Sequence, residues 1–247
     1  MKRIRLTVAY DGTAYCGWQI QPNGITIEEV INRALSRLTG EDIAVIGASR
    51  TDAGVHARGN VAVFDTMSAI PPERFAYAVN TVLPEDIAVV KSGEVPGNWH
   101  PRYAESVKSY EYRILNQEMP DPLRRKDTWH VSFPLDIDKM RQAAAYLTGE
   151  HDFRSFCSIH TGVKSTVRTI FSLDLDREDA VIVIRIKGNG FLYNMVRIIA
   201  GTLVDVGRGF YSPGEVRDIL EAKERKRAGA TAPPQGLILS SIEYGRN

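Results

Sequence analysis

Hydrophobic residues recur along the first part of the chain at spacings typical of strands and helices. Residues 4–10 alternate loosely between apolar and polar and end at Asp11-Gly12, a pattern typical of a strand followed by a turn. Thr26 and Glu29 have the spacing of a capping box, and an apolar stripe at helical spacing follows them. The predicted strands are 4–10, 43–46, 61–64 and 87–95, and the predicted helices are 26–38 and 71–82. Their order is β-α-β-β-α-β.

The second part of the chain repeats this order. Its predicted strands are 107–115, 166–175, 180–187 and 237–244, and its predicted helices are 137–147, 191–206 and 213–222. The repeated order predicts an α+β fold of two ferredoxin-like, RRM-like halves, each an antiparallel sheet with helices on one face. The Gly- and Pro-rich segment 96–102 separates an N-terminal domain, 1–101, from a C-terminal domain, 102–247. Ligands usually bind in grooves at domain junctions, so the active-site cleft is predicted between the halves.

The composition is that of a globular protein, with 43% apolar and 25% charged residues in a chain of 247. The net charge of +1 neither requires nor excludes a nucleic-acid partner, since a basic patch can be local. Two cysteines imply no disulfide framework, and the N-terminus has no apolar signal-peptide core. No apolar window reaches the roughly eighteen residues of a membrane span. The cytoplasm is therefore the predicted location.

Several common site motifs are absent from the sequence. The five histidines form no His-x-x-x-His pair, and no Walker loop or Gly-x-Ser-x-Gly elbow occurs. The turn at Gly188 and Gly190 follows a predicted strand as a dinucleotide-binding turn would, but Tyr193 stands in place of the third glycine. The neighbouring strands are also predicted to be antiparallel, which disfavours a nicotinamide or flavin site. We therefore expect neither a metal nor a cofactor.

A polar segment bounded by glycines, residues 47–59, lies between two predicted strands. Within it Asp52 follows Arg50 by two residues and precedes Arg58 by six, with His56 close by. A carboxylate among cations on a loop has the character of a catalytic group. Asp is also a common turn residue, because its side chain bonds nearby backbone N–H groups. Local chemistry by itself favours the turn.

Arg197 is the only cation in the apolar run 191–204. It lies either on a solvated stripe of the helix or in a groove, where a buried guanidinium needs a carboxylate partner. Asp205 is a partner on the same helix face, and Asp52 is a distant one.

Tyr110 and Tyr112 share one face of the predicted strand 107–115. Such tyrosines pack in a core or, beside cations, stack on a nucleobase. Most charge runs are solvated, but cations near a groove supply phosphate contacts. Two basic clusters have this character: Arg124, Arg125 and Lys126, and residues 223–227.

The segment Ser49-Arg-Thr-Asp-Ala-Gly-Val-His-Ala57 resembles the signature of the tRNA pseudouridine synthase A family. The resemblance extends over almost the whole chain and keeps the family's order of motifs. The other matching motifs are Asp11–Gln19, Trp99–Tyr103, Lys108–Tyr112, Asp152-Phe153, Gly190–Arg197 and Ala232–Leu237. This resemblance favours the catalytic interpretation of Asp52 over the turn.

The resemblance implies an enzyme that isomerises uridine to pseudouridine at positions 38, 39 and 40 of the tRNA anticodon stem–loop, with base flipping and without a cofactor. By matching motifs, Asp52 is the catalytic aspartate and Arg50 displaces or holds the target base. Tyr110 stacks on the uracil, Arg197 pairs with the aspartate, and Leu237 is an apolar wall of the pocket. The residues predicted to contact RNA elsewhere are His56, Arg58, Arg124, Arg125 and Lys126. The resemblance also implies a homodimer in which one tRNA contacts both subunits.

The alternative function is a non-catalytic RNA-binding protein built on tandem RRM-like sheets. It shares the groove, the basic clusters and the aromatic strand with the enzyme. The two functions differ at Asp52, because a carboxylate repels phosphate and a simple RNA binder has no use for one there.

Overall fold

The computed structural model describes residues 1–158 and 163–245, which form two compact units. Unit 1 comprises Met1–Ser106 with Leu239–Asn247, and unit 2 comprises Val107–Ile238. The division into domains at 1–101 and 102–247 stays a prediction, and the closing residues group with unit 1 although they follow unit 2 in sequence. No helix in the described residues is long and apolar enough to cross a membrane.

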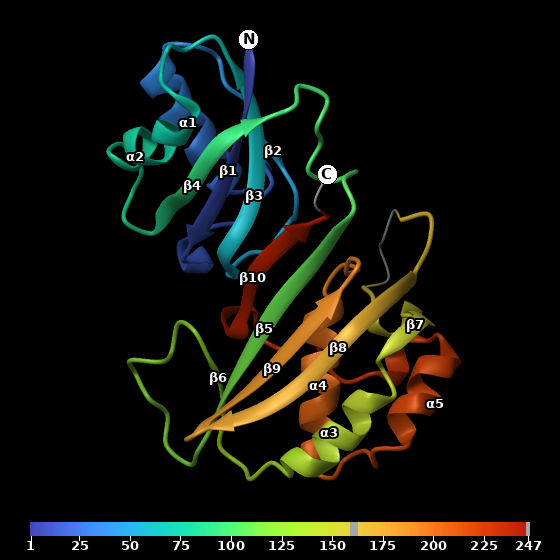
Figure 1. The fold of residues 1–247 in the computed structure, drawn as a ribbon. Helices are drawn as coiled ribbons and strands as arrows, with labels where there is room; N and C mark the ends of the chain where they lie inside the picture. The colour runs from blue at the N-terminus through green and yellow to red at the C-terminus, as the bar shows by residue number, and fades with distance from the viewer. Residues whose placement is uncertain (159–162, 246–247) are drawn as a thin grey trace. The chain divides into compact units, whose positions relative to one another are not determined.

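Unit 1 has the predicted β-α-β-β-α-β order. Its elements are β1 (Lys2–Tyr10), α1 (Ile27–Thr39), β2 (Ile46–Gly47), β3 (His56–Thr66), α2 (Phe75–Asn80) and β4 (Ile87–Val95). The strands are ordered β4-β1-β3, with antiparallel pairing, and β2 pairs with β3. The last strand, β10 (Leu237–Tyr244), lies beside β3. Helices α1 and α2 cover one face of this sheet (Figure 1).

The sequence signals for these elements act as expected. Thr26 Oγ1 accepts the backbone N–H of Glu29 at the start of α1, and Gly40 ends the helix in the left-handed conformation, with φ of 74°. On β1, the alternation turns Ile4, Leu6 and Val8 into the core, where they are fully buried. The intervening residues therefore lie on the sheet face that the helices leave open.

Unit 2 is also an antiparallel sheet with helices on one face (Figure 1). Its strands are β5 (Ser106–Asn116), β6 (Trp129–Val131), β7 (Gly149–Asp152), β8 (Val167–Glu178) and β9 (Val181–Gly188). Its helices are α3 (Ile137–Ala145), α4 (Met195–Gly207) and α5 (Glu215–Ala222). The strand order is β5-β9-β8-β7, and β6 adds a short parallel pairing to β5. The α+β class with two such units is confirmed.

Three of the predicted elements have other bounds in the structure. The helix predicted at 191–206 begins only at Met195, because Asn194 has a φ of 61° and cannot continue a right-handed helix. The helix predicted at 71–82 is a 3₁₀ turn, Pro72–Arg74, followed by the short α2. Strand β3 begins at His56, so the prediction that residues 56–59 belong to the loop is wrong.

The segment that leads into β10 packs directly on α4. A Cβ atom at Gly201 would lie 1.9 Å from the carbonyl oxygen of Ala230, so only glycine allows this approach. The N–H of Gly229 donates to Thr202 Oγ1 at 3.0 Å, and the N–H of Ala232 donates to the Arg197 carbonyl at 3.1 Å. These backbone contacts fix residues 229–232 along the helix.

Candidate active site

Asp52 lies in a turn between β2 and β3 in unit 1. The N–H of Val55 donates to the Asp52 carbonyl at 3.1 Å, and Gly54 has the positive φ, 76°, that the turn requires. Asp52 is half-buried, whereas Arg50 is exposed between buried Ser49 and buried Thr51. The turn expected from local chemistry is therefore present, and backbone groups close it. The catalytic role of the Asp52 side chain stays a prediction.

The loop rests on the motif that begins at Asp11. The N–H of Trp18 donates to the Thr51 carbonyl at 3.0 Å, and the indole of Trp18 is fully buried. Gly17 lies so close beneath the loop that a Cβ atom there would be 2.5 Å from the Thr51 carbonyl oxygen. The two motifs, more than thirty residues apart, form a single packed structure.

Buried side chains fix the loop from the other side. The hydroxyl groups of Tyr10 and Thr51 are 2.8 Å apart, and Asn60 Nδ2 donates to the Tyr10 hydroxyl at 3.3 Å. The same Asn60 amide donates to the Ser49 carbonyl at 3.0 Å. Because this network is buried, each bond is costly to break, and it holds the residues on both sides of Arg50. No sequence signal pointed to Tyr10 or Asn60, since both lie outside the loop.

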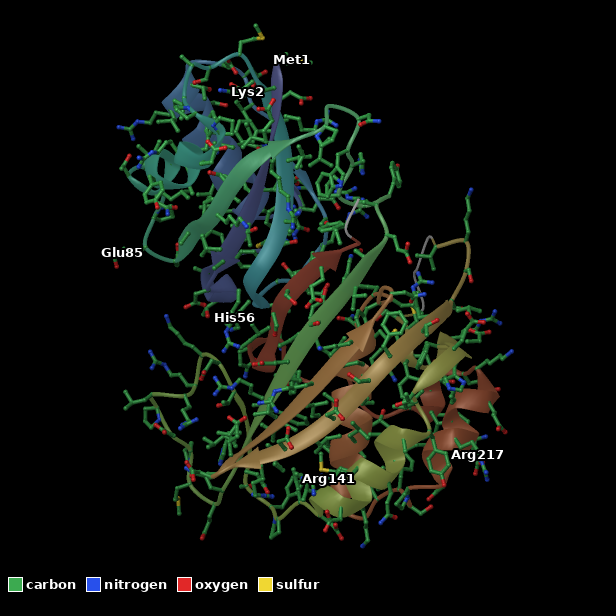
Figure 2. All side chains as sticks on the ribbon, viewed as in Figure 1. Met1, Lys2, His56, Glu85, Arg141 and Arg217 are labelled. Atoms are coloured by element: carbon green, nitrogen blue, oxygen red, sulfur yellow. The ribbon has the colours of Figure 1, made fainter. Side chains whose placement is uncertain are left out.

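His56, labelled in Figure 2, is buried at the start of β3. The N–H of Gly12 donates to its Nδ1 at 3.0 Å. The Asp11 carboxylate is 3.2 Å from Nδ1 and accepts the N–H of Thr13. His56 thus links the Asp11 motif to β3. An RNA contact for His56 stays a prediction, as it does for Arg58, which is exposed on β3.

A substitution at Gly17 tests whether the support of the loop matters for activity. Gly17 has a φ of 85°, so alanine there is strained and its Cβ also collides with Thr51. We expect Gly17→Ala to lower the predicted activity on the order of tenfold or more, since displacement of a catalytic group by about 1 Å costs up to about 10²-fold. Gly40→Ala is the matched control: its φ is 74°, but a Cβ there meets nothing within 4 Å. Equal single-turnover rates for the two variants would show that the Gly17 contact does not position the loop.

The predicted aromatic residues lie on β5 in unit 2, on the sheet face that packs toward the core. Tyr110 is opposite Ile186 of β9 and meets the Phe191 ring edge-to-face, with centroids 5.1 Å apart. Tyr112 is fully buried, which raises the pKa of its hydroxyl, and this group donates to the Pro233 carbonyl at 2.7 Å. Tyr112 is therefore a packing residue, and the role of Tyr110 as the stacking tyrosine stays a prediction.

Arg197 binds the same returning segment from α4. Its Nε donates to the Ala232 carbonyl at 2.8 Å, and its Nη1 donates to Asn194 Oδ1 at 2.9 Å. The partner expected on the same helix, Asp205, pairs instead with Arg208 at 2.8 Å. An ion pair of Arg197 with Asp52 would join residues of different units and stays a prediction. Beyond Pro233 the chain passes through a 3₁₀ turn to Leu237, which is buried.

The two basic clusters differ in their contacts. Arg125 and Lys126 are exposed in the connection between β5 and β6, and Arg124 is 3.6 Å from Asp121. In the second cluster, Arg225 donates to the carbonyls of Ala228 and Gly229, at 3.2 and 2.9 Å, which makes it part of the fold. Within residues 1–158 and 163–245, no group of three or more His, Cys, Asp or Glu side chains is arranged to hold a metal ion.

A family model described as tRNA pseudouridine synthase matches residues 6–104 and 143–245. The chain belongs to this family. Curated relatives named tRNA pseudouridine synthase A are 49% identical over 244 residues in Thermoanaerobacter sp. (strain X514) and in Brevibacillus brevis. Another, from Ruminiclostridium cellulolyticum, is 50% identical over 245 residues. Each alignment covers 99% of this chain and 100% of the relative.

Solved structures similar to this tRNA pseudouridine synthase include a Cbf5-Nop10-Gar1 complex and an archaeal box H/ACA sRNP Nop10-Cbf5 complex. The first has a TM-score of 0.37 and 13% identity, and the match covers 97% of this chain and 48% of the chain in that structure. The second has a TM-score of 0.36 and 13% identity, and the match covers 90% of this chain and 59% of the chain in that structure.

Membership in the family decides between the two functions considered from the sequence. The enzyme is an isomerase that converts uridine to pseudouridine in tRNA. The resemblance carried by the motifs is confirmed over the full length of the chain. The roles of the individual site residues are proposals.

Proposed function

We propose that this enzyme modifies uridines 38, 39 and 40 of the tRNA anticodon stem–loop and that Asp52 is its catalytic group. The observation that supports Asp52 most is the construction of its loop. A buried network through Tyr10 and Asn60 fixes one side, and the Trp18 motif supports the other. A loop that served only to connect two strands would not need this support.

The reaction needs a positioned group and no redox partner. The C1′–N1 glycosidic bond breaks, the uracil rotates, and C5 bonds to C1′; the hydrogen on C5 leaves as a proton, and N1 gains one. A carboxylate can add to C6, attack C1′ or remove the C2′ proton, and each step requires an ionised Asp52 held at a fixed place. The base must first leave the helical stack.

The remaining roles follow the chemistry of each side chain. Arg50 is exposed beside Asp52, where its guanidinium can fill the space left by the flipped base. Tyr110 holds the detached uracil by stacking, which permits rotation better than directional hydrogen bonds do. Arg197 keeps Asp52 ionised, and Leu237 is an apolar wall. The cations that supply phosphate contacts are Arg58, Arg124, Arg125 and Lys126, and His56, two residues before Arg58, is a further RNA contact.

We propose in addition that the enzyme acts in the cytoplasm as a homodimer, with one tRNA contacting both subunits. The sedimentation coefficient of the protein should fall on dilution, as the dimer dissociates into single chains. At saturation, one tRNA should be bound by two chains.

The target positions can be tested with three tRNA transcripts labelled with tritium at uracil C5. Each carries a single uridine among positions 38, 39 and 40, and a fourth transcript carries none. We expect tritium release from the first three, because formation of the C5–C1′ bond expels the C5 hydrogen. Release from the fourth transcript at the same rate would overturn the assignment of these positions.

A further inference from the structure

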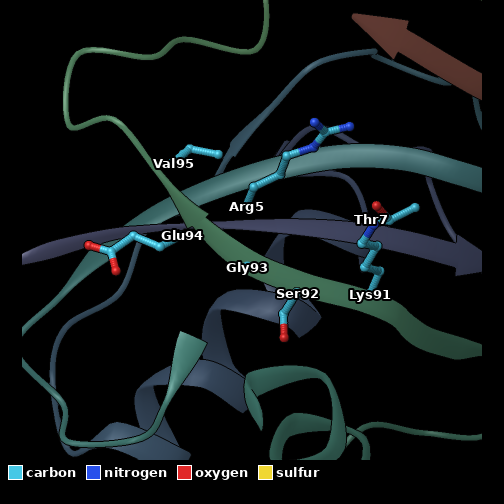
Figure 3. A pocket seen from close by; sticks show the side chains of 7 residues that line it. All are labelled: Arg5, Thr7, Lys91, Ser92, Gly93, Glu94 and Val95. Atoms are coloured by element: carbon cyan, nitrogen blue, oxygen red, sulfur yellow. The ribbon is translucent and has the colours of Figure 1, made fainter. Parts of the chain in front are cut away.

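The sheet of unit 1 has an open face with cationic side chains on two neighbouring strands. Ser92 of β4 points to the helix side, where its Oγ accepts the N–H of Ala76 at 2.9 Å. Arg5 of β1 and Lys91 of β4 lie on the opposite side (Figure 3). The open face therefore carries positive charge that the helical layer does not cover.

A hollow lies between these two cations. Arg5 is opposite Gly93 in the β1–β4 pairing, and Thr7 is opposite Lys91. Gly93 has no side chain, and a Cβ atom there would meet nothing within 4 Å, so the space between Arg5 and Lys91 is open. Glu94 borders the hollow but points away from both cations (Figure 3).

The Arg5 guanidinium is held in place by aromatic rings. It lies 5.4 Å from the centroid of Trp99 and 4.8 Å from that of Tyr244, both within cation–π distance. The two rings meet edge-to-face at 4.9 Å, and the Tyr244 hydroxyl donates to the Pro101 carbonyl at 3.0 Å. An anion that binds Arg5 therefore loses little free energy to the ordering of this side chain.

The charge of the hollow is not neutralised within the described part of unit 1. There, neither Arg5 nor Lys91 has a carboxylate within 4.0 Å. Arg3, two residues along the same face of β1, shows the contrast: it binds both carboxylate oxygens of Asp65, at 2.8 and 2.6 Å. The hollow thus offers two cations and the Thr7 hydroxyl to an external anion.

We infer that this hollow binds a backbone phosphate of the tRNA, apart from the Asp52 loop. The inference rests on the proposed function for the identity of the anion. Arg5 and Tyr10 lie on the same strand, about 17 Å apart at the strand rise of about 3.3 Å per residue. Tyr10 in turn bonds Thr51 of the loop. A phosphate in the hollow would therefore hold the RNA a few nucleotides from the reacting uridine.

The test is the affinity of an unmodified tRNA transcript for Arg5→Gln and Lys91→Gln, measured by filter binding at several salt concentrations. All variants carry Asp52→Ala, so that the tRNA is bound without being converted. We expect each change to weaken binding about tenfold, the effect of removing one charge-assisted hydrogen bond. The slope of log affinity against log salt should become shallower by roughly 0.7 to 0.9 for each phosphate that is no longer neutralised.

The matched control is Arg37→Gln, which removes one positive charge from the exposed side of α1. Its affinity should stay within about twofold of the Asp52→Ala parent, because a distant exposed charge is screened. The Lys91 side chain makes no hydrogen bond or ion pair in the described structure, so its variant should fold even if Arg5→Gln does not. Far-ultraviolet circular dichroism of each variant checks the fold.

Three results would overturn the inference. The first is tRNA binding by Lys91→Gln that equals the Arg37→Gln control. The second is a change in oligomeric state without a change in tRNA affinity, which would assign the face to a second copy of this chain. The third is that Arg5→Gln and Lys91→Gln bind inorganic phosphate more weakly while their affinity for tRNA is unchanged, which would make the hollow a site for free phosphate. Tritium release by Asp52→Ala would overturn the catalytic assignment of Asp52 instead. The tRNA affinities of the Arg5 and Lys91 variants would then still test whether the hollow binds a phosphate.

Discussion

Asp52→Ala is expected to lower tritium release from uracil C5 by about 10³- to 10⁴-fold. The reaction needs a group that bonds to the nucleotide or takes its proton, and general acid–base catalysis contributes up to about 10⁴-fold. Affinity for tRNA should not fall, because removal of a carboxylate removes a repulsion between the loop and the phosphates. Single-turnover release with excess enzyme and filter binding of the same transcript measure the two quantities.

The control for this change is Asp42→Ala, which removes an exposed carboxylate from the same unit just after α1. It should release tritium at the native rate. Equal release by native protein and Asp52→Ala would remove Asp52 from the chemistry and leave it as a turn residue. Asp52→Asn separates charge from shape, since the amide has nearly the size of the carboxylate but cannot act as the base.

Arg197→Leu has the second largest expected effect, a loss of activity on the order of 10²-fold or more. It removes the proposed partner of Asp52 and also the bonds to the Ala232 carbonyl and to Asn194. Arg197→Lys keeps the charge, but a single ammonium group cannot reproduce both bonds. Activity should therefore rise from leucine to lysine to arginine, as measured by single-turnover tritium release.

Thermal unfolding distinguishes a catalytic effect of Arg197 from a structural one. If Arg197 serves only to hold residues 229–232, Arg197→Leu lowers the melting temperature but still releases tritium at the native rate at temperatures below its unfolding transition. Arg217→Leu, at an exposed position on α5 (Figure 2), is the control for loss of an arginine from a helix of unit 2. It should change neither quantity by much, because surface ion pairs contribute little.

The fold could be predicted where the hydrophobic pattern was long and its ends were marked. The bounds of β4 and β10 were predicted to the residue, and α1 was predicted to within one residue because Thr26 and Gly40 mark its ends. Strands β6 and β7 were missed because three or four residues are too few to show a period. The late start of α4 depends on the left-handed Asn194, which apolar spacing does not reveal.

The candidate site was predicted in part. Asp52 was found through the resemblance of its loop to the family signature, since local chemistry favoured a turn. Two of the residues that support the loop could not be found, because their proximity is tertiary: Tyr10 and Asn60 are fifty residues apart and meet only when β1 pairs with β3. His56 was assigned to the loop because polar residues surround it, although it begins a strand.

The place of β10 has a consequence for folding during synthesis. Unit 2 is one continuous stretch, so it can fold as soon as its last residues leave the ribosome, whereas unit 1 needs residues 239–244 beside β3. The fit there is close, since a Cβ atom at Gly59 would lie 2.8 Å from the Ser240 carbonyl oxygen. Until residues 239–244 have left the ribosome, β3 therefore exposes an edge able to pair with other nascent chains. Unit 1, whose first residues are synthesised before unit 2, is therefore completed after it.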